Sequence, residues 1–159
     1  MEPYDCTKDV NKHRGLVDEY ITDICSMMYS RAMDHDLSKL EEPEKSIIDK
    51  HFNVDPELLP AAHSTAAVEQ RKQESKALDH HYLVNRHHLE HHVNGAQNMS
   101  ILDLMEMLCD WRAYAMEAGE YEDPKYKGLI KKLNLEEQRM DIPKDIVAIL
   151  RNTIETLRW

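Results

Sequence analysis

The sequence predicts an all-α protein in a single domain, residues 1–159. Apolar residues recur at helical spacing along most of the chain, and runs of alternating apolar and polar residues are missing. Only 4 glycines and 6 prolines occur, with 42% apolar and 31% charged residues, which excludes collagen-like, low-complexity and disordered chains. A chain of 159 residues is long enough to bury a core without disulfides or structural metals.

The first predicted helix spans residues 7–32, with Thr7 as its N-cap. Its apolar stripe follows spacings of three and four residues through Val10, Val17, Ile21, Ile24 and Met28. His13 lies on the same stripe between Val10 and Val17. The phase therefore predicts that His13 points inward.

Five more helices are predicted, over residues 43–52, 64–92, 100–118, 123–133 and 143–157. Pro43 suits the first helical position, and the pair Asn94-Gly95 ends the long helix by accepting a left-handed conformation. Ser100 and Asp103 have the spacing of a capping box. About six helices with short connections describe an all-α bundle.

Composition excludes several partners. The formal charge of −10 argues against binding duplex nucleic acid, which needs clustered Lys and Arg. No stretch approaches the roughly 20 apolar residues that span a bilayer. Residues 1–14 are too polar for a signal peptide, and the three cysteines have no disulfide or zinc spacing. These observations predict a cytoplasmic protein that binds no membrane.

The pair His35-Asp36 is the sharpest local feature of the sequence, followed closely by Lys39. An imidazole nitrogen and a carboxylate oxygen side by side can bind one divalent ion. The alternative is that Asp36 serves only as a helix N-cap that accepts backbone N–H groups.

Histidine is concentrated in one window. Six of the 10 histidines fall between His80 and His92. On a helical wheel His81, Asn85, His88 and His92 share one face, and His80, His87 and His91 share the neighbouring face. The first face is predicted to point inward and the second to be more exposed, so one of His87 and His88 faces the site. The alternative is a solvated histidine surface.

Carboxylates form a narrow stripe on the otherwise apolar helix 100–118. They are Asp103, Glu106, Asp110 and Glu117. The stripe is either the one solvated edge of a buried helix or a row of carboxylates directed at a cationic site. Asp103 already has an explanation as a capping residue.

Taken together, these residues follow the order H…HD…H…D. This order resembles that of the HD-domain superfamily of metal-dependent phosphohydrolases, which are helical bundles. The motifs HDLSK at 35–39, NRHH at 85–88 and EMLCDW at 106–111 resemble those of a small uncharacterised family found in bacteria and phages. The resemblance covers residues 12–114, and the helices of residues 123–159 lie outside it.

The resemblance implies a set of site residues. His13, His35, Asp36 and Asp110 would be the primary metal ligands, with Asp36 bridging if two ions bind. His81 and His88 would hold a second ion or contact a substrate phosphate. Lys39 would hold a phosphate oxygen.

The leading hypothesis is a divalent-metal-dependent phosphohydrolase acting on a nucleotide or other small phosphate ester. Histidine and carboxylate ligands without thiolate suit Mn, Fe, Co, Ni or Zn. The alternative is a non-catalytic helical interaction protein, perhaps encoded by a phage, with a structural metal or none. The sequence leaves open the substrate, the number of ions and the oligomeric state, with a homo-oligomer among the options.

Overall fold

The computed structural model describes residues 4–51, 60, 64–117 and 126–158. These residues form helices and no strand, which confirms the all-α prediction. The chain divides into two units, Met1–His35 and Asp36–Trp159. None of the described helices is both long enough and apolar enough to cross a membrane.

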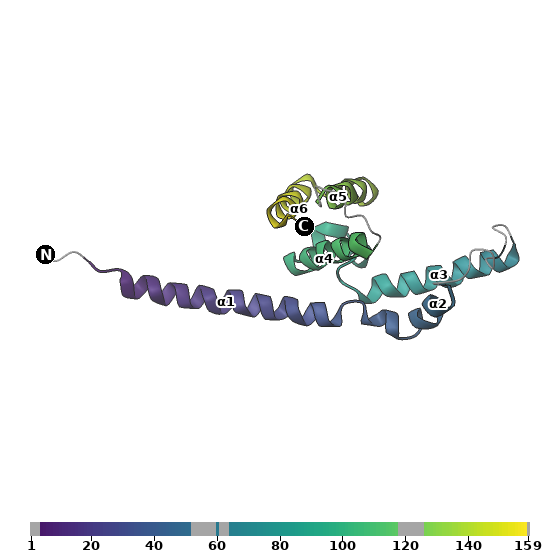
Figure 1. Cartoon of the computed structure of the whole chain (residues 1–159), viewed down its shortest axis with the longest axis horizontal. Helices are drawn as coiled ribbons and strands as arrows, with labels where there is room; N and C mark the ends of the chain where they lie inside the picture. Colours follow the sequence, from purple (N-terminus) through teal and green to yellow (C-terminus); the bar gives the residue numbers. More distant parts are fainter. Residues whose placement is uncertain (1–3, 52–59, 61–63, 118–125, 159) are drawn as a thin grey trace. The chain divides into compact units, whose positions relative to one another are not determined.

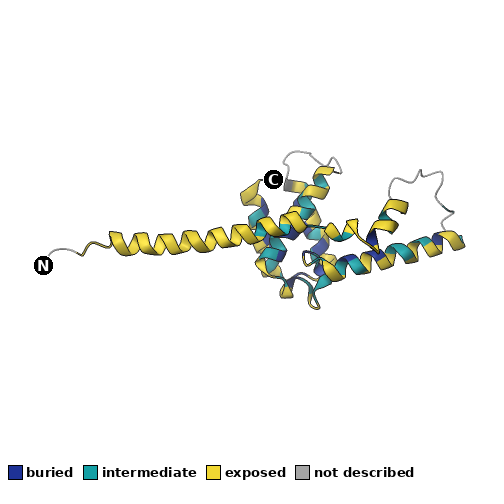
Figure 2. Cartoon of the chain, turned by 90° about the horizontal axis from the view of Figure 1, so that it is seen from below, coloured by how far each residue is buried: buried dark blue, intermediate teal, exposed yellow. Residues whose placement is uncertain are grey.

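The first unit contains α1, Thr7–Asp34, close to the predicted 7–32. None of the residues of α1, all of which the structure describes, is buried, and Figure 2 shows the helix exposed along its length. Within the first unit the prediction that His13 points into a core is therefore wrong, because this side chain is exposed there. A stripe of apolar residues predicts a face that can be buried, but it does not supply the surface that would bury it.

The described part of the second unit holds five α-helices, which Figure 1 labels. They are α2 Glu44–His51, α3 Thr65–Val84, α4 Ile101–Glu117, α5 Tyr126–Met140 and α6 Lys144–Leu157. The 3₁₀ segments among the described residues are η1 Leu37–Leu40, before α2, and η3 Leu89–His91 and η4 Gly95–Asn98, between α3 and α4. The helix predicted for 123–133 runs on to Met140, and its predicted start lies outside the described residues, as do residues 52 and 118.

The long helix predicted for 64–92 ends eight residues early, at Val84. Asn85 adopts an extended conformation, with φ −104° and ψ 107°. Its side-chain Nδ2 donates to the His81 carbonyl at 2.9 Å and to Ser38 Oγ at 2.8 Å. A polar side chain that hydrogen-bonds to the last turn of its own helix competes with the backbone hydrogen bonds that would extend the helix. One helical wheel for residues 64–92 therefore does not describe the residues beyond Val84.

The start of α4 confirms the predicted capping box. Ser100 Oγ accepts from the Asp103 backbone N–H at 3.2 Å, and Asp103 Oδ2 accepts from the Ser100 N–H at 2.8 Å. Asp103 is fully buried and also accepts from Arg86 Nη2 at 3.1 Å. Asp103 therefore fixes the segment after α3 against the first turn of α4.

The core of the second unit lies between α4, α5 and α6. Its buried apolar side chains are Leu89, Ala96, Met107, Leu108, Leu129, Leu133, Ile142, Val147, Leu150 and Ile154. Each large side chain buried in this way contributes about 1.5–3 kcal/mol by leaving water. Elsewhere in the unit α2 packs beside α3 (Figure 1) and contacts η1. These contacts and those between α3 and η1 bring η1 and α3 together.

Candidate metal centre

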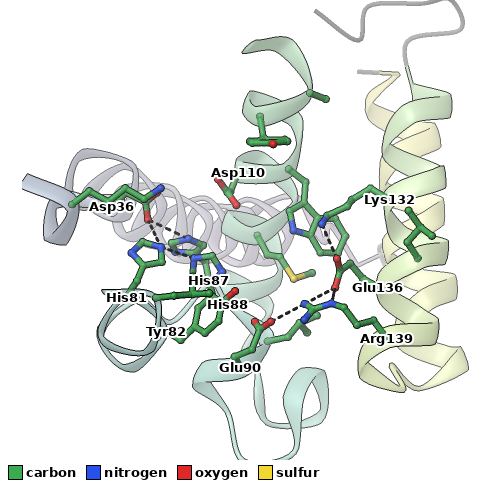
Figure 3. Close-up of a pocket in the computed structure, with 18 of the residues that line it drawn as sticks. Asp36, His81, Tyr82, His87, His88, Glu90, Asp110, Lys132, Glu136 and Arg139 are labelled. Atoms are coloured by element: carbon green, nitrogen blue, oxygen red, sulfur yellow. Dashed lines mark hydrogen bonds and ion pairs between the residues drawn. The ribbon is translucent and has the colours of Figure 1, made fainter. Parts of the chain in front are cut away.

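Two overlapping sets of ligand-type side chains meet in the second unit. Asp36, His81, His87 and His88 each offer a ligand atom, and these four atoms lie within 4.8 Å of one another. Ligand atoms of Asp36, His87 and Asp110 also lie within 4.8 Å of one another. Figure 3 shows the imidazoles and the two aspartates gathered at one end of a pocket. We call these five residues the imidazole–carboxylate cluster.

Asp36 is the common member of both sets. Its backbone is left-handed, with φ 55° and ψ 18°, at the residue before η1. Its Oδ1 lies 3.4 Å from His81 Nε2 and 3.4 Å from His87 Nε2, while Oδ2 accepts from Lys39 Nζ at 2.6 Å. Within the described chain its side chain makes no capping hydrogen bond to η1. The interpretation of Asp36 as only an N-cap is therefore wrong.

A buried carboxylate orients His81. Glu44, at the start of α2, is 1% exposed, and its Oε2 lies 2.8 Å from His81 Nδ1 while its Oε1 lies 2.8 Å from His80 Nδ1. Burial alone would raise the pKa of Glu44, but hydrogen bonds with His80, Ser38 and His81 outweigh it, so this pKa is lowered. An ionised carboxylate only accepts, so His81 Nδ1 carries a hydrogen, and Nε2 is the ring nitrogen that lies beside Asp36.

His87, like His81, has a buried carboxylate beside its Nδ1. The imidazole is 2% exposed, and its Nδ1 lies 3.2 Å from Oε1 of Glu106, which is itself buried on α4. Its Nε2 lies 3.4 Å from Asp36 Oδ1.

Two ring nitrogens, His81 Nε2 and His87 Nε2, thus lie 3.4 Å from the same carboxylate oxygen, an arrangement that a bound cation would stabilise. Histidines that bind metals usually donate their other ring N–H to a carboxylate or carbonyl, as Glu44 and Glu106 allow here. The donor set of the cluster fits a divalent ion.

His88 and Asp110 complete the cluster. His88 Nε2 lies 2.8 Å from His81 Nε2, and burial, followed by the nearby His87 and His81, lowers the pKa of His88 to about 3. This imidazole is therefore neutral at pH 7. Asp110 projects from the middle of α4 and is half-buried.

The structure brings together four of the predicted site residues, Asp36, His81, His88 and Asp110, with Lys39 bonded to the first of them. His35 is the last residue of the first unit and is joined to Asp36 by a peptide bond. His13 also belongs to the first unit. The ligand roles of all these residues stay predictions.

Sequence reasoning misplaced His87, which was predicted to be more exposed than His88. The structure buries His87 and leaves His88 half-buried, because α3 has already ended when the chain reaches them. Both imidazoles belong to the cluster, so the expectation that only one of the two faces the site is wrong as well. Asn85, a frequent residue at helix ends, was the signal for this break.

The carboxylate stripe on α4 faces inward. Asp103 and Glu106 are buried and Asp110 is half-buried, whereas Glu117 is exposed. The interpretation as a solvated edge is therefore wrong for the first three residues. Glu44, the other carboxylate that orients a histidine, had no distinguishing signal in the sequence.

The pocket that the cluster opens into has a volume of about 770 Å³. At its other end, α5 presents Lys132, Glu136 and Arg139 (Figure 3). Glu136 accepts from Lys132 Nζ at 2.7 Å and from Arg139 Nε at 2.7 Å, and Arg139 Nη2 also donates to Glu90 at 2.7 Å. All these residues belong to the second unit.

The fold and the cluster define an all-α protein with a candidate divalent-metal centre at one end of a small-molecule-sized pocket. The chain belongs to a family of unknown function, DUF5662, whose sequence profile matches residues 2–156. Neither the curated proteins nor the solved structures contain a match to the chain.

Proposed function

We propose that this protein is a divalent-metal-dependent phosphohydrolase that acts in the cytoplasm on a nucleotide or other small phosphate ester. One observation carries the proposal: His81 and His87 direct Nε2 at the same oxygen of Asp36, each 3.4 Å away, while buried carboxylates lie beside their Nδ1 atoms. The order of these residues along the chain also agrees with the resemblance to the HD-domain superfamily, which remains part of the proposal.

Asp36, His81 and His87 would hold the ion, with His88 and Asp110 as further ligands or as ligands of a second ion. Nitrogen and oxygen donors without thiolate suit Mn, Fe, Co, Ni or Zn. A divalent ion in such a site lowers the pKa of a bound water and polarises a phosphoryl oxygen, which is the chemistry that ester hydrolysis needs.

The chain itself supplies binding and orientation. Lys39 lines the pocket, and its exposed ammonium group lies next to Asp36, where it can hold a phosphate oxygen as a point charge. Glu44 and Glu106 keep the two imidazoles in one tautomer, so that their Nε2 atoms stay directed at Asp36.

The test replaces Asp36 by Asn, which preserves shape and removes the negative charge. Asp49→Asn is the matched control, because Asp49 is exposed on α2 and pairs with Lys45. Elemental analysis of the purified protein and hydrolysis of p-nitrophenyl phosphate with each added metal are the measurements. We expect Asp36→Asn to lose metal and hydrolysis while circular dichroism shows the same helix content, and Asp49→Asn to keep both. Full metal content and full activity in Asp36→Asn would overturn the proposal.

The second candidate is a non-catalytic helical interaction protein, and α1 favours it. This helix exposes large apolar side chains at Val10, Leu16, Val17, Tyr20, Ile21, Ile24 and Met27. Exposed apolar surface of this extent is typical of a site where a partner binds. Stoichiometric metal binding without hydrolysis of any phosphate ester would favour this candidate over the enzyme.

A further inference from the structure

We infer that the end of the pocket next to α5 binds a flat, uncharged organic group, so that the substrate is a phosphate monoester of an aromatic ring system rather than a polyphosphate. A nucleoside monophosphate has this chemistry. The inference rests on the proposed function, because it assumes that the phosphate of the same molecule lies at the imidazole–carboxylate cluster.

Charge is the first support. Of the three cations of α5 that line the pocket, Lys131, Lys132 and Arg139, the last two already pair with Glu136 and Glu90. Burial would raise the pKa of Glu136, but hydrogen bonds with Lys132 and Arg139 outweigh it and lower this pKa, so the carboxylate is ionised. This group of four side chains carries no net charge, and it offers no excess of positive charge to a chain of phosphates.

The same balance holds for the described lining as a whole. It contains four cationic and six carboxylate side chains, which leaves a net charge of −2. One divalent ion would bring this sum to zero, a value compatible with one phosphoryl group. A triphosphate would add about four negative charges, more than the four cationic side chains of the described lining can balance beside its six carboxylates.

The second support is the apolar and aromatic surface between the two ends. Leu89, Met107 and Leu129 are buried core residues that also line the pocket. Trp111 is half-buried beside them, and Lys132 Nζ lies 5.6 Å from the centroid of its ring. Small-molecule pockets of roughly 300–1,000 Å³ that are mainly apolar, with few polar groups, bind organic bodies of this kind.

The two parts of the proposed site, the cluster and the ring site at Trp111, are adjacent in the sequence. Asp110 belongs to the cluster and Trp111 follows it directly on α4. Both residues line the same pocket, so one small molecule can place its phosphate at the imidazole–carboxylate cluster and its ring at Trp111. A flat ring of any kind can stack on an aromatic side chain, and this contact needs no charge.

Tryptophan fluorescence tests the ring site without any hydrolysis. The chain has 2 tryptophans, so Trp159→Phe leaves Trp111 as the single reporter. We expect adenosine, which carries no phosphate, to change the Trp111 emission saturably, and inorganic phosphate to leave it unchanged. An emission that adenosine does not alter would overturn the inference, even if the enzyme hydrolyses phosphate esters.

Kinetics test the same site during turnover. Trp111→Ala should raise KM for adenosine monophosphate roughly tenfold, the scale of losing a base–aromatic contact, and leave KM for glycerol phosphate unchanged. Ile149→Ala is the control, because Ile149 is an exposed apolar residue of α6, and it should change neither. The inference fails if adenosine triphosphate is hydrolysed with a higher kcat/KM than the monophosphate, or if glycerol phosphate is as good a substrate. Absence of hydrolysis with every ester, alongside adenosine binding, would remove the proposed function and with it the assignment of the ring site to a substrate.

Discussion

Replacing Glu44 by Gln is the sharpest test of how the cluster is held. The substitution keeps the size and shape of the side chain and changes one oxygen to an amino group. In the native protein the two Glu44 oxygens lie 2.8 Å from Nδ1 of His80 and of His81. A glutamine oxygen can accept from only one of these imidazoles, and its amino group then faces the other.

The consequence for the cluster follows from the tautomer of His81. An amino group facing Nδ1 favours the form with the hydrogen on Nε2, and this form no longer offers a lone pair toward Asp36. Loss of a carboxylate that orients a metal-binding histidine typically costs about 10–100-fold in affinity, or about 1.4–2.7 kcal/mol. A buried hydrogen bond to a charged group contributes about 1.5–3 kcal/mol, which agrees with this range.

The assay is a Zn²⁺ titration by calorimetry, with a chelator competing when binding is tight. Glu42→Gln is the matched control two residues away, because Glu42 is exposed and accepts from Ser46 Oγ at 2.7 Å. We expect Glu44→Gln to bind Zn²⁺ about 10–100-fold more weakly, the usual cost of losing an orienting carboxylate. The control should bind Zn²⁺ with native affinity. Equal affinities in both variants, with unchanged helix content, would refute the role of Glu44.

Three further predictions concern stability. Leu133→Ala removes a fully buried side chain from the α4–α5–α6 core and should cost about 2–5 kcal/mol in urea unfolding, without weakening metal binding in the protein that remains folded. Ser100→Ala removes the capping box of α4 and should cost about 0.5–2 kcal/mol, measured as a lower Tm. A bound divalent ion at about 100 times its Kd should stabilise the protein by about 2.7 kcal/mol, and Asp36→Asn should abolish this gain in the same thermal scan. A gain that survives in Asp36→Asn would mean that the ion binds elsewhere.

Local features of the sequence determined most of the second unit. The capping box at Ser100 and the apolar period of α6 were sufficient, because both act between residues a few positions apart. The end of α5 was harder to place, since nothing between residues 133 and 140 either breaks or extends a helix decisively. No local signal reported whether the stripe of α1 would be buried, because burial depends on a surface contributed by other elements.

The candidate site was predicted in its chemistry and only in part in its geometry. Asp36 and Asp110 were identified from motifs, and the structure places their oxygens near His87. The orienting carboxylate of His81 was not predictable, because Glu44 resembles any acidic residue in a first helical turn. Its role arises only when α2 packs against α3. His80 and His81 follow Glu44 in the sequence by 36 and 37 positions.

The early end of α3 explains why both His81 and His87 can face Asp36. On a continuous helix, two residues six positions apart lie about 9 Å apart along the axis and point about 120° away from each other. Neither displacement allows both Nε2 atoms to lie 3.4 Å from one oxygen, as they do here. The extended backbone at Asn85 removes this constraint, and its side chain ties the break to Ser38 on η1, two residues after Asp36. The break in the helix is therefore a requirement of the site, and the residue that makes the break also fixes the segment that carries the shared carboxylate.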